Sequence, residues 1–148
     1  MDKTEQILLA LLTRLQGTPY EPADGSTVAV ARNLSVPSLI PDGGLVILRD
    51  GDSGEPDWTL GGFDDHHYYR HAIPVEIHVQ HADGAERDQR FSALVGWIFS
   101  VLKGDRTLGG LVTGMVFGLP ESDLQLVEGG AAIKSGRVMI MVEYGCEI

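Results

Sequence analysis

Residues 66–81, HHYYRHAIPVEIHVQH, predict one long β-strand, and the rest of the chain can be arranged around it. In its second half, branched apolar side chains alternate with polar ones, the apolar set being Ile73, Val75, Ile77 and Val79. A period of two places one face of the strand on a core and the other against water or a partner. Pro74 cannot donate a backbone hydrogen bond, which predicts an edge strand or a bulge at that position.

A second strand with the same alternation is predicted at residues 137–144, RVMIMVEY. Met139 and Met141 fall on its outer parity, so they either form a second core beneath a helix or contact another subunit. Between the two strands, Asp83 and Glu86 begin an amphipathic helix that Lys103 and Gly104 end. Its apolar stripe consists of Phe91, Leu94, Val95, Ile98, Val101 and Leu102.

The remaining elements are shorter. Asp2 and Glu5 start an N-terminal helix over residues 3–16, which Gly17 and Pro19 end. Further strands are expected at residues 28–32, 44–49, 112–118 and 124–127, with a hairpin region at 131–135. This order predicts a single α+β domain over residues 1–148, with a mainly antiparallel twisted sheet, an amphipathic helix packed on one face and an N-terminal helix.

The composition narrows the functional classes. The net charge of −10 argues against a nucleic-acid binder, because lysine and arginine supply most of that affinity. No stretch of 18 apolar residues is present, so no membrane association is expected. Cys146 is the only cysteine, which excludes an internal disulfide and favours the cytosol.

The five histidines all lie on or beside the long strand. Neighbours of the same parity are four or more residues apart, about 13 Å along a strand, so this strand alone cannot assemble a metal site. A small metal-binding enzyme that used histidines of residues 66–81 would need further metal ligands from Asp64, Asp65 or residues 50–57. The other interpretation is a solvated or subunit-facing strand end whose charge depends on pH.

Residues 50–65, DGDSGEPDWTLGGFDD, predict an acidic loop or hairpin. Its acids are spaced like calcium ligands, but glycines stand at positions 54 and 61, where an EF-hand needs an oxygen ligand, so a solvated loop is expected. Cys146 has no histidine near it in sequence, and the chain lacks the nucleophile motif G-x-S-x-G. We therefore expect no enzyme, no catalytic residue and no cofactor.

Several short motifs follow one another in an order that resembles a known family. They are Arg32-Asn33, Pro37, Pro41, the strand at 44–49 with Asp50-Gly51, D-R-T-L-G-G-L at 105–111 and V-E-Y at 142–144. Together with the long strand and the helix, this order resembles the tail-terminator or tail-completion proteins of long non-contractile-tailed phages and of gene transfer agents, the family of the lambda tail terminator.

The resemblance implies a structural virion protein assembled in the bacterial host cytoplasm and located at the head-proximal end of the tail. Such proteins form a hexameric ring of identical chains that ends tube polymerisation and provides the head-joining surface. The implied partners are the tail tube protein and the head–tail connector, and DNA passes through without specific binding. A neck or connector component is the alternative. The candidate subunit or tube contacts are Asp50, Asp52, Glu55, Asp57, Trp58, His67, His71, Met139 and Met141.

Overall fold

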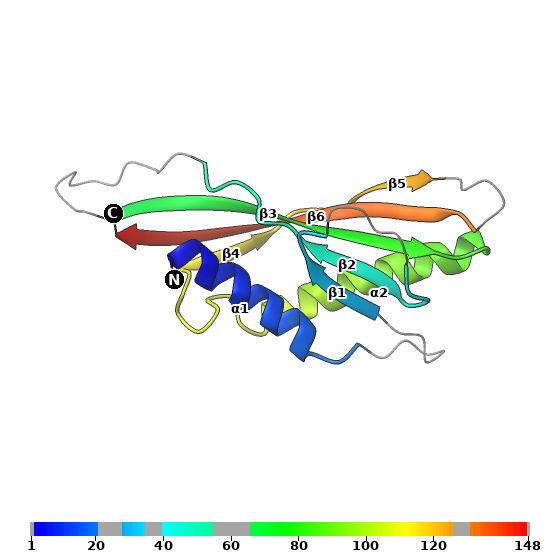
Figure 1. The fold of residues 1–148 in the computed structure, drawn as a ribbon, viewed down its shortest axis with the longest axis horizontal. Coiled ribbons are helices and arrows are strands. Elements are labelled where there is room, and N and C mark those ends of the chain that lie inside the picture. Colours follow the sequence, from blue (N-terminus) through cyan, green and yellow to red (C-terminus); the bar gives the residue numbers. More distant parts are fainter. Residues whose placement is uncertain (1, 21–27, 35–39, 55–65, 126–130, 148) are drawn as a thin grey trace.

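The computed structural model describes residues 2–20, 28–34, 40–54, 66–125 and 131–147. Within them, two helices and six strands follow one another along the chain (Figure 1). Their bounds are α1 Lys3–Gly17, β1 Val28–Arg32, β2 Gly44–Leu48, β3 His66–Gln80, α2 Gly84–Lys103, β4 Gly114–Phe117, β5 Glu121–Gln125 and β6 Ile133–Glu147.

The strands form one mixed sheet in the order β1-β2-β3-β6-β4, and β5 also pairs with β6. β1 and β2 are parallel, and the other four pairings are antiparallel. β3 and β6 pair along their whole length, from His66 opposite Glu147 to Gln80 opposite Ile133, and form the long ribbon in Figure 1. The predicted α+β fold with a mainly antiparallel sheet is confirmed.

Pro74 lies inside the sheet, so the predicted edge position is wrong, whereas the pairing on the β2 side shifts by one residue beside it, from Arg49 opposite Pro74 to Asp52 opposite Ala72. β3 pairs with β2 on one side and β6 on the other, and its register with β6 runs without a break. The Pro74 carbonyl accepts a hydrogen bond from the Arg49 N–H at 3.0 Å, one residue beyond the end of β2. The backbone groups of Pro74 face β2 and not β6. Its missing N–H therefore removes one hydrogen bond at the end of the short strand β2 and none between β3 and β6.

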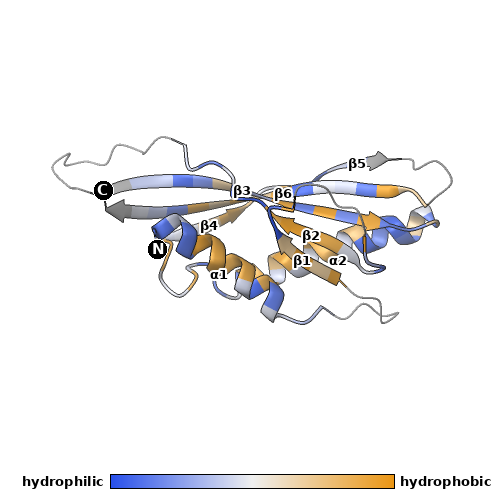
Figure 2. Cartoon of the chain, in the orientation of Figure 1, coloured by the Kyte–Doolittle hydropathy of each residue, from blue (hydrophilic) through white to orange (hydrophobic). Residues whose placement is uncertain are grey.

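Both helices lie on one side of the sheet (Figure 1). All six residues of the predicted stripe on α2 are buried, and Asp83 accepts hydrogen bonds from the N–H groups of Ala85 and Glu86. On α1, Asp2 accepts from the Glu5 N–H at 2.8 Å, as predicted. Orange and blue bands along α1 in Figure 2 mark its amphipathic pattern, and its buried residues are Ile7, Leu8, Leu11 and Leu15.

One apolar cluster joins these helical stripes to the inner face of the sheet. It takes the odd-numbered residues of β3 from Ile73 to Val79 and the even-numbered residues of β6 from Val138 to Tyr144. The predicted inner parities of both long strands are therefore confirmed. Burial of each large side chain contributes about 1.5–3 kcal/mol before the entropy of ordering is subtracted.

The strand boundaries in the C-terminal third differ from the prediction. β6 begins at Ile133, so most of the predicted hairpin at 131–135 belongs to a strand. β4 is shorter than the predicted 112–118, and β5 begins at Glu121 rather than at 124. Residues 126 and 127 of the predicted strand lie outside the described residues. The β5 segment, ESDLQ, is polar and becomes a strand because it pairs with β6 rather than by its own propensity.

Candidate assembly surface

The face of the sheet opposite the helices carries a row of apolar side chains. On this face Ala72 of β3 lies opposite Met141 of β6, which in turn lies opposite Val116 of β4. Pro74 lies opposite Met139 in the next row. These five residues from three adjacent strands form what we call the helix-free patch. Val116 is 62% exposed, and the other four are half-buried.

This arrangement bears on one of the two interpretations of Met139 and Met141, the second core beneath a helix. Among the described residues no helix covers their face, because α1 and α2 both pack on the other side (Figure 1). The interpretation of a second core beneath a helix is therefore wrong. An apolar patch that stays open to solvent marks a contact site for another molecule more often than a random surface does.

The patch borders an irregular edge strand. β4 and β5 pair with the same side of β6, but their registers differ by one residue: Phe117 lies opposite Ile140, whereas Glu121 lies opposite Arg137. Extending both registers places two residues, Leu119 and Pro120, against the single residue Val138. This is the geometry of a β-bulge. It turns Leu119 outward, where it is 90% exposed.

Ion pairs flank the patch on the same face. Glu76 pairs with Arg49, and Arg137 pairs with Glu121 at 3.6 Å. Toward the other end of the ribbon, Arg70 pairs with Glu143 at 3.3 Å. A polar rim of this kind around an apolar centre is the usual composition of a protein–protein interface.

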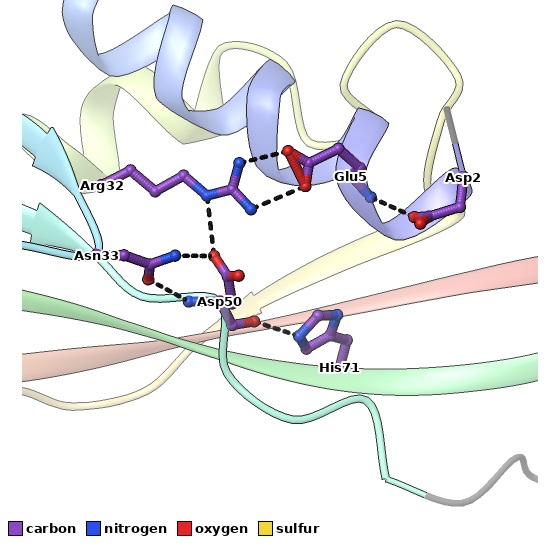
Figure 3. Close-up of polar contacts among 6 residues, drawn as sticks. All are labelled: Asp2, Glu5, Arg32, Asn33, Asp50 and His71. Atoms are coloured by element: carbon purple, nitrogen blue, oxygen red, sulfur yellow. Dashed lines mark hydrogen bonds and ion pairs between the residues drawn. The ribbon is translucent and has the colours of Figure 1, made fainter.

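Asp50, one of the predicted contact residues, belongs to an ion-pair network that ties α1 to the sheet (Figure 3). Arg32, at the end of β1, binds Glu5 through two hydrogen bonds of 2.6 and 2.9 Å and binds Asp50 through a third of 2.9 Å. Asn33 donates to the same Asp50 oxygen at 2.8 Å. These bonds lower the pKa of Asp50 and of Glu5, and they raise the pKa of Arg32. Asp50 therefore holds elements of the fold together.

His71 does not fit the predicted surface role, because its side chain is only 2% exposed. Its Nε2 lies 2.6 Å from the Asp50 carbonyl oxygen, so Nε2 carries the proton and donates (Figure 3). Its Nδ1 lies 3.1 Å from the Tyr144 hydroxyl, and that hydroxyl lies 3.2 Å from the Thr4 hydroxyl. This chain of hydrogen bonds joins α1, β3 and β6, and it makes His71 a buried structural residue.

The other predicted contacts are only partly described. Asp52 bridges to Ala72 on β3, and its carboxylate accepts from the Gly54 N–H at 2.8 Å. For His67 only the backbone is described, in β3 opposite Cys146. Glu55, Asp57 and Trp58 lie outside the described residues.

One polar hollow of about 400 Å³ was not predicted as a site, although Glu76 and His78 share a parity that is visible in the sequence. The Ser135 hydroxyl lies 2.7 Å from His78 Nδ1, whereas the buried Nε2 has no hydrogen-bond partner. Burial lowers the pKa of His78. The Glu76 carboxylate lies 4.0 Å from Nε2, beyond hydrogen-bond distance, and is paired with Arg49. The three groups therefore do not form a relay for nucleophilic catalysis.

Three metal-ligating side chains do not gather at any one point in the part of the chain that the structure describes. Neither described helix combines the length and the apolar character needed to cross a membrane.

No protein-family model matches the sequence, and no curated protein matches it.

Proposed function

We propose that the protein is a structural assembly protein that forms a ring at the head-proximal end of a phage-type tail tube. The ring ends tube polymerisation and offers the surface that the head joins. The observation that supports this proposal most strongly is the helix-free patch, which provides an open apolar surface on a rigid sheet.

The patch is suited to a protein partner rather than to a small molecule. Its members project from adjacent strands in register, so they form a continuous surface across three strands, and none of them lines a hollow described above. Methionine is enriched at protein interfaces, where its flexible side chain adapts to a partner. We assign the tail tube protein to this face, because a terminator must bind the tube tightly enough to stay on its end.

The edge of the sheet also suits a component that stops growth. A regular edge strand would accept a further strand from another chain, whereas a bulge and a proline discourage such addition. The β4–β5 junction has both features, the bulge at residues 119–120 and the proline at position 120. This edge can therefore make specific side-chain contacts without starting open-ended strand addition.

The charge of the chain agrees with a ring through which DNA passes. Six copies at a net charge of −10 each would repel the phosphate backbone and keep non-specific affinity low. This argument supports passage without specific binding, and the connector remains the expected partner on the head side.

The proposal is tested by adding the purified protein to its cognate tail tube protein during polymerisation. We expect the protein to bind one end of each tube and to stop elongation, which electron microscopy measures as the length distribution and the density at tube ends. Binding to the connector without binding to tubes would replace the proposal by a neck component. Unchanged tube lengths together with bare tube ends would contradict it.

A further inference from the structure

The described surface contains an apolar projection and an apolar hollow that lie on different parts of the chain. The projection is the bulge at Leu119 and Pro120, where both side chains are exposed and Leu119 reaches 90% exposure. A leucine this exposed at a bulge contributes nothing to the core, so its burial requires another molecule.

The hollow lies between α1 and the turn that follows α2. Its apolar walls are Leu9, Ala10, Leu108 and Leu111, and its volume is about 500 Å³. Arg14 and Asp105 form an ion pair at its rim, and this pairing lowers the pKa of Asp105. The hollow belongs to the helix side of the sheet, because α1 forms one of its walls (Figure 1).

From these two features we infer that Leu119 and Pro120 of one copy insert into the hollow beside α1 of the next copy. This inference rests on the proposed ring and names the contact that closes it. A ring needs heterologous contacts, in which one patch meets a different, complementary patch. The bulge and the hollow are such a pair on a single chain.

Charge supports a second copy as the occupant. The net charge of −10 makes two copies repel each other, so their contact needs local attraction. Beside the bulge, Glu121 is paired with Arg137, and the exposed Asp123 adds a further negative charge. Beside the hollow, Arg14 is paired with Asp105, and the exposed Arg106 adds a further positive charge. Asp123 beside the projection and Arg106 beside the hollow therefore carry opposite charges that attract each other across the contact.

Engineered cysteines test the contact directly. In a Cys146→Ser background, which removes the only native thiol, Ala10→Cys is placed in the hollow and Leu119→Cys on the bulge. Each chain then carries both halves of the contact. Mild oxidation of assembled protein is expected to give a ladder of covalent trimers and larger species, because a disulfide forms only when the two Cα atoms approach within about 7 Å.

Two controls keep the result specific. Each single-cysteine variant has one thiol and can give at most a covalent dimer. The pair Ala10→Cys and Leu34→Cys places the second thiol on another exposed leucine, after β1, and is expected to give no ladder. An equal ladder from this control pair would overturn the inference.

A substitution without cross-linking gives an independent reading. Leu119→Asp is expected to weaken self-association about tenfold or more, measured by light scattering, and to leave thermal unfolding unchanged because the side chain is exposed. Rings that still form without the ladder would overturn this contact and leave the proposed ring intact. Protein that neither self-associates nor binds tubes would overturn the proposed function together with the contact.

Discussion

Removing the apolar character of the helix-free patch should weaken tube binding without unfolding the chain. The perturbation is the double variant Val116→Thr and Met141→Gln. Threonine keeps the branched shape of valine, which strands favour, and glutamine keeps the length of methionine. We expect the free energy of unfolding to change by less than about 1 kcal/mol, because both side chains lie on the solvent side of the sheet.

The expected loss of affinity for the tube follows from how much of each side chain is still exposed to solvent in the single chain. Full burial of a valine or methionine side chain contributes about 1.5–3 kcal/mol. Val116 is 62% exposed and Met141 is half-buried, so each can contribute about 1 kcal/mol more on contact. Loss of both contributions, about 2 kcal/mol, weakens binding roughly 30-fold.

The assay is co-sedimentation of the protein with preformed tail tubes over a range of protein concentrations, with thermal unfolding of each variant measured in parallel. Leu34→Gln is the matched control, because it removes an exposed apolar side chain outside the patch and should bind like the wild type. An unchanged dissociation constant for the folded double variant would refute the assignment of this face to the tube.

Three further predictions concern the fold. Arg32→Met should lower the free energy of unfolding near neutral pH, because it removes the ion pair with Asp50. The difference in this free energy between variant and wild type should shrink as pH falls below 3.8, the ordinary pKa of Asp50, and through its lowered pKa in the folded protein; urea unfolding over this pH range measures the difference. Because burial lowers the pKa of His78, the wild type should lose stability as pH falls below 6.5, and His78→Gln should remove that slope; a slope retained by the variant would contradict this cause. Gly136→Ala should lower the free energy of unfolding by about 1–3 kcal/mol, since the new Cβ would lie 2.3 Å from a β5 carbonyl oxygen and 2.6 Å from a ring carbon on α2, whereas Gly114→Ala, with nothing within 4 Å, should be nearly neutral in thermal unfolding.

The elements that the sequence predicts well are those whose signals are local. The apolar residues of α2 recur three or four positions apart, and its cap at Asp83 acts on residues in the first turn. Each signal therefore lies within a short stretch of sequence, and the helical period and the capping pattern together predict the helix. The inner parities of β3 and β6 follow from strict alternation in the same way. Pro74 was misleading because its effect depends on where β2 ends, which the sequence of β3 does not contain.

The parts that the sequence does not predict depend on pairing between distant residues. The burial of His71 follows its shared parity with Ile73, but its partners Asp50 and Tyr144 lie far away along the chain. The bulge at Leu119 is visible only when the registers of β4 and β5 against β6 are compared. For the same reason, the sequence of its own strand does not show whether Met141 lies beneath a helix or on a face that is exposed to solvent.

The most direct test of the account is to image the protein with cognate tail tubes by electron microscopy and count the ends that carry a ring. We expect one ring of identical subunits on a single end of each tube and no elongation beyond it. Tubes that lengthen normally in excess protein, with no density at either end, would contradict the central claim.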